Sequence, residues 1–255
     1  MTQPSPEFQV SLARSDDEIA QAQRLRYDVF IREMGGDGPL VDHAAGRDVD
    51  AFDAAADHMV LRDMTRPAGQ RIVGVYRLLT MAGAEKAGGF YSASEFDLSP
   101  LIRSGRRLLE LGRSCVHKDY RGGQGMFQLW SALARYVSTH QIDVLFGVAS
   151  FHGTDTQAHA LPLAYLHHAH LAPAELCPRA TVFHDMNTIP ADQIDRKAAM
   201  RAVPPLIKAY LRLGGMVGAG AFVDHAFNTT DVCLVLDLDR MSDKQRAIYL
   251  GKSTA

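Results

Sequence analysis

The chain lacks long apolar runs, an apolar N-terminal segment and a large net charge. No stretch reaches the ~18 consecutive apolar residues that a membrane-spanning helix needs. Residues 1–15 are polar, so we expect no secretory signal segment. The formal net charge of −2 argues against general nucleic-acid binding, which requires a strongly basic face.

Cysteine is also scarce, since only 3 are present and they are scattered along the chain (Cys115, Cys177 and Cys233). An odd, dispersed set fits a reducing cytoplasm and no disulfide framework. The 255 residues can bury one substantial core, and a hydrophobic content of 47% is typical of a globular protein. Because no repeat or linker interrupts the chain, we predict a single domain over residues 1–255, with loose tails at 1–7 and about 245–255.

The most informative segment lies between Leu108 and Gly125, where an apolar strand leads into a glycine-rich turn. A helix is predicted to follow over residues 126–140. Backbone N–H groups of such a turn and of a helix N-terminus can bind an anion. The strand also carries Glu110, a candidate base, and Arg113, a candidate anchor.

Other elements can be predicted from residue patterning. Strands are expected at residues 8–12, 58–62, 72–80, 143–151, 219–225 and 231–237. Helices are expected from a Ser15 cap to about residue 30, at about 156–168, and at about 195–213. Residues 35–56, 81–107 and 171–193 read as loops.

This order resembles the acyltransferase fold of the GNAT superfamily. The resemblance implies an α/β (α+β) fold with a mixed, mostly antiparallel central sheet flanked by helices, here with an extended C-terminal region. The usual turn of that fold is Arg-x-x-Gly-x-Gly/Ala. In this chain the glycines are displaced, because Arg121 is followed by Gly122, Gly123, Gln124 and Gly125. The departure argues against a simple acetyl-CoA donor.

The chain resembles acyl-homoserine-lactone synthases in a set of motif residues. The matching positions are Arg26 and Phe30, Asp50 and Asp53, Arg77, and finally Glu110 and Arg113.

A closer resemblance, to bacterial L-ornithine Nα-acyltransferases, covers nearly the whole chain. Its most specific segments are residues 90–98, 109–117, 145–155, 165–173, 204–215 and 227–233. It implies transfer of a 3-hydroxy fatty acyl group from acyl carrier protein to the α-amine of L-ornithine, which forms lyso-ornithine lipid. Phosphopantetheine is then part of the donor, and no permanently bound cofactor is expected. A cytoplasmic enzyme follows, and a peripheral contact with the cytoplasmic face of the inner membrane is compatible with it.

Glu110 is the candidate catalytic residue, because an amine attacks a thioester only as the free base. A lysine-like amine has a pKa near ~10, so a carboxylate acting directly or through a water can take its proton. The alternative is a structural ion pair of Glu110 with Arg113 or Arg77.

The candidate substrate-binding residues are Asp50, Asp53, Arg26, Phe30, Arg77 and Arg113. The guanidinium groups of Arg77 and Arg113 can fix a carboxylate or a phosphate. The acidic loop can receive the cationic amines of ornithine. The alternatives are salt bridges within the fold and a solvated turn.

Candidate donor-binding residues follow on the same strand and turn: Ser114, Cys115, Val116, Lys118, Arg121, Gly122, Gly123 and Gly125. Acyl carrier proteins are strongly acidic, so a basic cluster at the two ends of the strand can steer docking. Its members are Arg103, Arg106, Arg107, Lys118 and Arg121. A merely solvated basic face is the alternative.

The histidines of the second half of the chain do not form a recognisable metal site. Those at 152, 159, 167, 168 and 170 lack familiar metal-ligand spacing, so no metal is expected. The competing functions are an acyl-homoserine-lactone-type or other N-acyl amino acid synthase and, from another class, a non-catalytic protein that binds acyl carrier protein.

Overall fold

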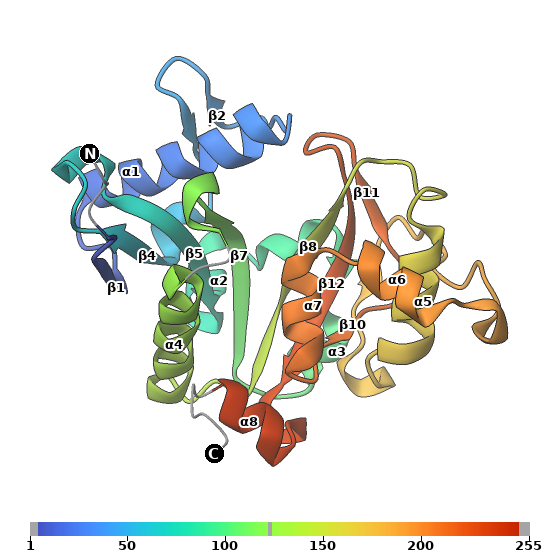
Figure 1. Ribbon diagram of the computed structural model, residues 1–255. Coiled ribbons are helices and arrows are strands. Elements are labelled where there is room, and N and C mark those ends of the chain that lie inside the picture. The colour runs from blue at the N-terminus through green and yellow to red at the C-terminus, as the bar shows by residue number, and fades with distance from the viewer. Residues whose placement is uncertain (1–4, 122–123, 250–255) are drawn as a thin grey trace. The chain divides into compact units, whose positions relative to one another are not determined.

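The computed structural model describes residues 5–121 and 124–249, and the chain divides into two units (Figure 1). The first unit comprises residues up to Gly88 together with Leu111–His140. The second unit comprises Gly89–Glu110 and the chain from Gln141 onward. Strand β7 (Leu108–Val116) contributes to both, because its first three residues belong to the second unit.

The first unit is built on antiparallel strands. Strand β1 (Phe8–Leu12) pairs with β4 (Asp57–Asp63), and β4 pairs with β5 (Ile72–Thr80). Residues 111–116 of β7 lie next to β5 in the strand order. A two-stranded hairpin, β2 (Val41–Asp42) and β3 (Arg47–Asp48), stands apart from this sheet.

Helices cover both faces of the first unit's sheet. Helix α1 (Asp16–Arg26), which continues as the π-helical segment η1 (Tyr27–Glu33), packs a core of Ala22, Leu25 and Val29 against Val60 and Val75. Helix α4 (Gln124–Thr139) packs on β1 and β4, where its Gly125 lies close to Leu61. Since neighbouring strand residues point to opposite faces, Val60 and Leu61 place α1 and α4 on opposite sides.

Helix α2 (Met81–Ala87) was expected to be part of a loop, and that expectation was wrong. Thr80 caps it by accepting a hydrogen bond from the Gly83 backbone N–H (3.2 Å). A Cβ on Gly83 would lie 2.5 Å from the Ala55 carbonyl oxygen, so glycine permits close approach to the 3-10 turn η2 (Asp53–Ala55). Gly83 therefore serves helix packing, and Gly88, with φ = 84°, ends the helix.

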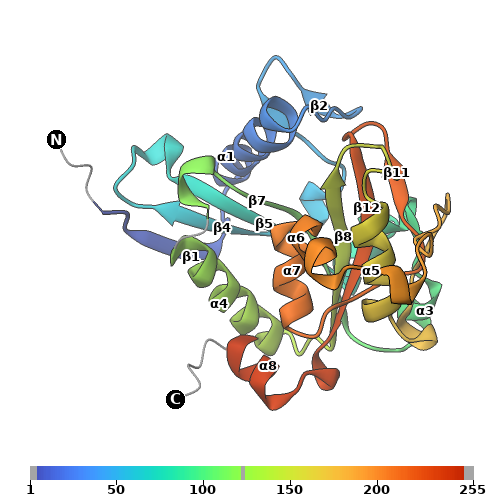
Figure 2. The same ribbon diagram turned by 45° about the vertical axis from the view of Figure 1, so that its right-hand side comes forward.

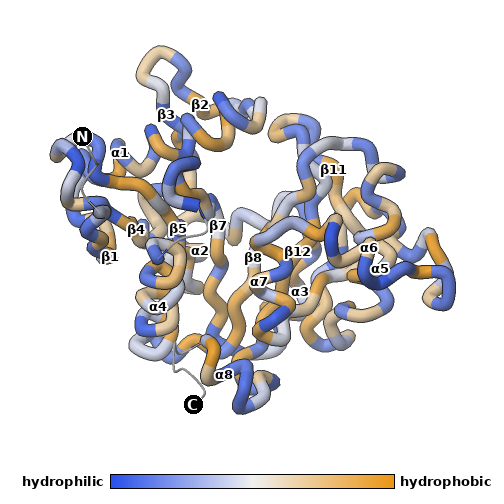
Figure 3. Tube along the Cα trace, viewed as in Figure 1, coloured by the Kyte–Doolittle hydropathy of each residue, from blue (hydrophilic) through white to orange (hydrophobic). Residues whose placement is uncertain are grey.

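The second unit contains a long antiparallel pair. Strand β8 (Val144–His152) pairs with β12 (Thr229–Asp237) from Val144↔Asp237 to His152↔Thr229. On its other edge β8 pairs in parallel with β7 through Leu108, Leu109 and Glu110. Strands β10 (Met216–Val217) and β11 (Phe222–Asp224) add to β12. Every residue of β12 is buried, and hydrophobic residues follow much of β8 and β12 (Figure 3).

The remaining elements of the second unit surround these strands (Figure 2). The helices are α3 (Ser99–Arg103), α5 (Ala160–His170), α6 (Arg196–Ala202), α7 (Pro205–Arg212) and α8 (Asp243–Tyr249). Strand β6 (Phe96–Asp97) pairs with β9 (Arg179–Ala180). The 3-10 turns are η4 (Tyr91–Ser94), η6 (Ala174–Leu176), η7 (Ala191–Gln193) and η8 (Leu238–Arg240); η3 (Ala68–Gln70) and η5 (Lys118–Tyr120) belong to the first unit.

The predicted fold class is confirmed, because antiparallel pairs dominate a mixed sheet with helices beside it. The single helix predicted over 195–213 was wrong: Pro204 and Pro205 divide it into α6 and α7, since proline cannot continue a helix. Helix α8 occupies part of the predicted C-terminal tail. None of the helices described is both long and apolar enough to cross a bilayer.

Candidate active site

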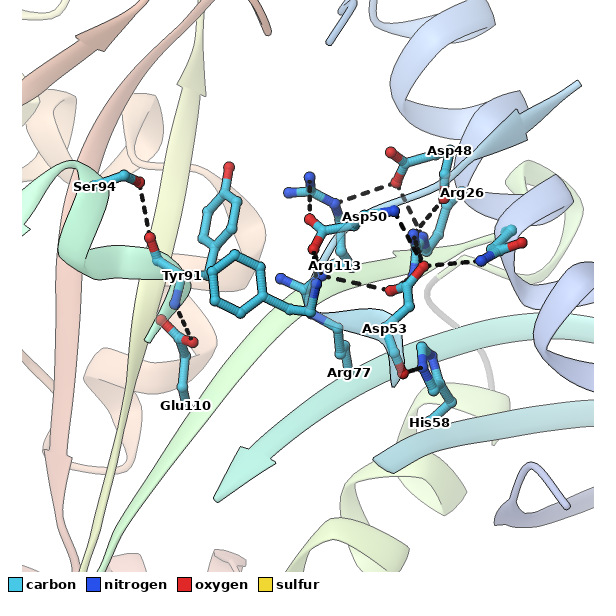
Figure 4. Close-up of polar contacts among 12 residues, drawn as sticks. Arg26, Asp48, Asp50, Asp53, His58, Arg77, Tyr91, Ser94, Glu110 and Arg113 are labelled. Atoms are coloured by element: carbon cyan, nitrogen blue, oxygen red, sulfur yellow. Dashed lines mark hydrogen bonds and ion pairs between the residues drawn. The ribbon is translucent and has the colours of Figure 1, made fainter. Parts of the chain in front are cut away.

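Three arginines and three aspartates of the first unit form a buried group, which we call the arginine–aspartate cluster (Figure 4). Its arginines come from three separate elements: Arg26 ends α1, Arg77 lies on β5 and Arg113 lies on β7. Its aspartates come from one short stretch that begins at the last residue of the β2–β3 hairpin: Asp48, Asp50 and Asp53. The cluster therefore ties this stretch to the helix and to the sheet.

Arg26 is the most deeply buried member, with 0% of its surface exposed. Its Nε lies 3.0 Å from Asp48 Oδ2, and its Nη1 lies 2.8 Å from Asp53 Oδ1. Its Nη2 also donates to the Asp48 carbonyl oxygen and, at 2.9 Å, to Asp53 Oδ2. A buried guanidinium needs such partners, because an unpaired buried charge is strongly destabilising.

Arg77 and Arg113 share Asp50 between them. Arg77 Nη1 lies 2.7 Å from Asp50 Oδ1, and Arg113 Nη2 lies 2.9 Å from Asp50 Oδ2. Arg113 Nε is 3.2 Å from Asp48, and Arg77 Nη1 is 3.5 Å from Asp53. Each aspartate thus contacts two arginines, and the three positive charges match the three negative ones.

The protonation of the aspartates reflects this pairing. Burial raises the pKa of Asp53, but hydrogen bonding to Arg26 and its charge outweigh burial and lower that pKa to about 2. Burial likewise raises the pKa of Asp50, and the charges of Arg77 and Arg113 turn the net shift downward. Both side chains are therefore carboxylates at neutral pH.

Arg113 has an unusual backbone conformation, with φ = 48° in the left-handed region. A non-glycine residue in that region costs of order 1 kcal/mol or more. The ion pairs of its side chain with Asp48 and Asp50 offset this cost. Strain of this kind is found where a side chain must point in a fixed direction, and it marks Arg113 as a positioned group.

The ion-pair alternative for Asp50, Asp53, Arg77 and Arg113 is the arrangement that the structure shows. Their role in binding the acceptor stays a prediction. The cluster also includes Asp48, which sequence reasoning placed in the loop without assigning it a role. Phe30 packs on the core between α1 and β5 and forms no part of the cluster.

Glu110 has a different environment, in the second unit. Its side chain is buried, and one carboxylate oxygen accepts a hydrogen bond from the backbone N–H group of Tyr91 (2.9 Å; Figure 4). The other carboxylate oxygen accepts a hydrogen bond from the backbone N–H group of Ser92 (2.6 Å). The two donors open the turn η4, whose position is supported by the edge-to-face contact of Phe90 with Phe146 at 5.0 Å.

Sequence reasoning did not foresee the backbone donors that hold Glu110. A signal was present, because the segment 90–98 is among those that carry the resemblance to ornithine acyltransferases. Backbone donors leave no trace in residue type. For this reason the pattern of side chains indicated only an ion pair with Arg113 or Arg77 as the alternative role for Glu110.

The candidate donor residues on β7 and beyond have mixed environments. Cys115 and Val116 are buried, Ser114 is partly exposed, and burial raises the pKa of the Cys115 thiol to about 12. A thiol of that pKa is a poor nucleophile at neutral pH, which favours direct transfer without an acyl-cysteine. Gly122 and Gly123 lie outside the described residues.

Gly125 lies in the first turn of α4, against β4. A Cβ there would lie 2.8 Å from Leu61 Cδ2, so close helix–sheet packing accounts for this glycine. Its predicted role in donor binding stays a prediction.

Most arginines of the predicted basic cluster are paired with carboxylates. Arg106 contacts Asp237 (2.9 Å) and Asp239 (2.7 Å), and Arg107 contacts Asp143 (3.1 Å). Arg121 pairs with Glu33 at 2.5 Å. Ion pairs among the described residues include neither Arg103 nor Lys118, whose side chains are exposed. The role of the basic cluster in docking an acidic partner stays a prediction.

The sequence of the chain is similar to one described protein family and to named acyltransferases. Residues 25–131 match the family described as "Acetyltransferase (GNAT) domain". The chain is 56% identical over 244 residues to an L-ornithine N(alpha)-acyltransferase of Rhodobacter capsulatus, covering 95% of this chain and 94% of the relative. It is 44% identical over 248 residues to the protein of that name from Brucella abortus, covering 95% of this chain and 88% of the relative.

Among solved structures, the fold is similar to that of a CoA-dependent acyl-homoserine lactone synthase, BjaI. The TM-score is 0.53 at 16% identity, and the match covers 97% of this chain and 92% of that one. This likeness concerns the fold alone.

Proposed function

Because the chain belongs to the family of L-ornithine N(alpha)-acyltransferases, we propose that it transfers a 3-hydroxy fatty acyl group from acyl carrier protein to the α-amine of L-ornithine. The product is lyso-ornithine lipid, and the reaction takes place in the cytoplasm, from which the product enters the inner membrane. The phosphopantetheine arm of the carrier belongs to the donor substrate, so no resident cofactor takes part.

The observation that carries the chemistry is the buried carboxylate of Glu110, held by two backbone N–H groups. In the reaction the amine nitrogen forms a bond to the thioester carbonyl carbon, and the carbon–sulfur bond breaks. The amine loses a proton, which Glu110 accepts directly or through a water, and the leaving thiolate takes up a proton. Fixed N–H donors hold the carboxylate in one orientation, which favours proton transfer in a defined direction.

Support for the carrier protein as donor comes from the glycine turn. The chain has Gln124 between Gly123 and Gly125, so its glycines do not follow the spacing of the pyrophosphate-binding turn of GNAT acetyltransferases. The similar fold of BjaI belongs to a CoA-dependent enzyme, so fold alone does not select between the two donors.

A panel of donors and acceptors tests the proposal. The purified full chain is incubated with 3-hydroxyacyl carrier protein or 3-hydroxyacyl-CoA, and with ornithine, lysine or S-adenosylmethionine, and products are identified by mass spectrometry. We expect acyl-ornithine, with the higher kcat/KM for the carrier-bound donor. A lactone from S-adenosylmethionine would support the homoserine-lactone alternative. Carrier binding without any acylated product would support the non-catalytic alternative.

A further inference from the structure

A second group of acidic side chains lies in the second unit. Glu95 follows the turn η4, Asp224 ends β11 and Asp231 lies on β12. One oxygen of each lies within 4.8 Å of the others, and we call these three residues the carboxylate cluster. Glu95 and Asp231 are 4% and 2% exposed, and Asp224 is half-buried.

The backbone around the carboxylate cluster is firmly held. Strands β11 and β12 form a hairpin in which Phe222 pairs with Asp231 and Asp224 with Thr229. The Glu95 carbonyl oxygen accepts two hydrogen bonds from Thr181, from its backbone N–H (2.8 Å) and its hydroxyl (2.9 Å). The three carboxylates are therefore brought together by the fold and not by flexible side chains alone.

The two aspartates of the carboxylate cluster differ from the aspartates of the arginine–aspartate cluster in their charged partners. None of the ion pairs among the described residues involves Asp224 or Asp231, whereas Asp48, Asp50 and Asp53 each pair with arginines. Asp224 Oδ1 instead accepts the backbone N–H groups of Ala226 (2.8 Å) and Phe227 (3.1 Å). Two carboxylates that lie close together without a cation repel each other.

The hydrogen bonding of Asp231 gives an independent indication that a ligand binds at the carboxylate cluster. Its Oδ2 accepts a hydrogen bond from the Thr229 hydroxyl (3.1 Å), whereas its buried Oδ1 has no hydrogen-bond partner. Burial raises the pKa of Asp231 to about 6; the neighbouring hydroxyls of Ser150 and Thr229 oppose the rise, and the charge of Asp224 adds to it. A buried acceptor atom without a donor is costly unless a ligand supplies one.

We propose that the carboxylate cluster binds the side-chain ammonium group of the diamino acid acceptor. The inference rests on the proposed function, and it names the part of the protein that selects a diamino acid. An ammonium has three N–H donors and one positive charge. At ~2.8 Å from each acceptor, it can bridge three oxygens that lie within 4.8 Å of one another.

An ammonium fits this cluster better than a divalent cation. Calcium takes about 6–8 oxygen ligands, whereas the cluster offers one oxygen from each of three residues, and Asp224 already receives two backbone N–H donors. The arginine–aspartate cluster is a poorer site for the same ammonium, because its three aspartates are matched by three arginines.

The carboxylate cluster shares a face of the second unit's sheet with Glu110. Asp231, Cys233 and Val235 alternate along β12 and so point to one side. Val235 pairs with Phe146, and Phe146 pairs with Glu110. Burial raises the pKa of Cys233, and the charges of Glu110 and Glu95 raise it further, so both carboxylates lie near this thiol. An acceptor anchored at the cluster has its other amine on the side of Glu110.

Two acceptors with the same carbon chain test the inference. Norvaline is ornithine without the side-chain amine, so the ratio of kcat/KM for the two reports on recognition of that amine alone. In Asp231→Asn and Asp224→Asn we expect the KM for ornithine to rise about 10- to 100-fold, because a charge-assisted hydrogen bond is lost. The kcat/KM for norvaline should change by less than about threefold. Asp192→Asn, at an exposed position on η7, is the matched control.

Several results would overturn the inference. Equal losses with both acceptors indicate a structural role, and an unchanged ornithine-to-norvaline ratio indicates no role. Loss of activity in EDTA with recovery in Mg²⁺ or Ca²⁺ indicates a metal site instead. If Asp231→Asn does not fold, the half-buried Asp224→Asn decides.

A failure of the proposed function can be distinguished from a failure of this inference, because the wild type would then acylate neither ornithine nor norvaline. Calorimetric titration of ornithine and norvaline into the wild type and Asp224→Asn then tests the cluster without turnover. Tighter binding of ornithine that is lost in the variant supports the inference, and equal binding of both amino acids overturns it.

Discussion

The two units of the chain contain buried carboxylates in opposite electrostatic settings. In the first unit, Asp48, Asp50 and Asp53 each contact two arginines, and the pKa of Asp53 falls to about 2. In the second unit, Asp231 has a buried oxygen without a donor, and its pKa rises to about 6. A carboxylate with its cation supplied by the chain stabilises the fold, whereas one that lacks a cation is suited to receive one from a substrate.

Glu110 is intermediate between these settings, because two backbone N–H groups hold it. The change Glu110→Gln preserves size but removes the basic site, so we expect kcat to fall about 10²- to 10⁴-fold. Residual activity should rise with pH, as more free amine becomes available. Single-turnover rates and thermal melting on one preparation measure both effects.

A folded Glu110→Gln protein with wild-type turnover would end the assignment of a general base. Glu175→Gln, which alters an exposed pair with Arg240, is a suitable control for the loss of a carboxylate.

Loss of one charge from the arginine–aspartate cluster should strongly lower the free energy of unfolding. Asp53→Asn removes a buried negative charge that pairs with Arg26 and Arg77. We therefore expect the free energy of unfolding to fall by about 3 to 5 kcal/mol. Denaturant titration measures this free energy. Asp28→Asn, in an exposed pair with Arg32, should change stability by less than about 0.5 kcal/mol.

The pH dependence gives this prediction a second test. The pKa of Asp53 is lowered from 3.8 to about 2 on folding, so the unfolded chain binds the proton more tightly. The stabilisation is present above pH 3.8 and is lost as the pH falls toward 2. The difference between wild type and Asp53→Asn should therefore shrink across that range, and a pH-independent difference would contradict the pairing.

The contribution of the carboxylate cluster to folding stability should depend on pH in the opposite direction. Asp231 has its pKa raised from 3.8 to about 6, so the folded state binds the proton more tightly and stability falls as pH rises between those values. The cost is full above pH 6 and absent below 3.8. Asp231→Asn removes it, and we expect about 1 to 3 kcal/mol of added stability at pH 7.5 and none at pH 3.5. Denaturant titration at both pH values measures this, and destabilisation at pH 7.5 would contradict the contrast.

The smallest expected effect concerns docking of the carrier. Within the predicted basic cluster, Arg103 and Lys118 are exposed and take part in none of the ion pairs among the described residues. We therefore expect Arg103→Gln and Lys118→Gln each to raise the KM for acyl carrier protein roughly 2- to 5-fold at low salt. Steady-state kinetics at two salt concentrations measure it. The paired Arg107→Gln is the control, and an equal effect in all three would argue against selective docking.

Local signals made much of the fold predictable. The Ser15 cap was confirmed, since its hydroxyl accepts the Glu18 backbone N–H at 3.3 Å. Strand β1 begins at Phe8, as its alternating pattern indicated. The division of α6 from α7 was missed, although Pro204 and Pro205 mark it in the sequence. Helix α2 was missed although Thr80 caps it, and its Gly83 serves packing.

The candidate site was predictable where motifs exist and not where distant segments meet. Motifs identified Arg26, Arg77, Arg113, Asp50 and Asp53, but residue spacing could not show that these side chains satisfy one another. The carboxylate cluster was not foreseen, because Glu95 and Asp231 come together only through the tertiary fold. The segments 90–98 and 227–233, which carry the resemblance, contain both residues.

Acyl transfer to the α-amine of ornithine can be tested most directly with a nitrogen label. Ornithine labelled with ¹⁵N at the α position is incubated with the full chain and 3-hydroxyacyl carrier protein, and the product is observed by proton–nitrogen correlation. We predict an amide signal on the labelled nitrogen, formed in proportion to the free carrier released. An acyl group on the unlabelled side-chain nitrogen, or carrier release without any amide, would contradict the account.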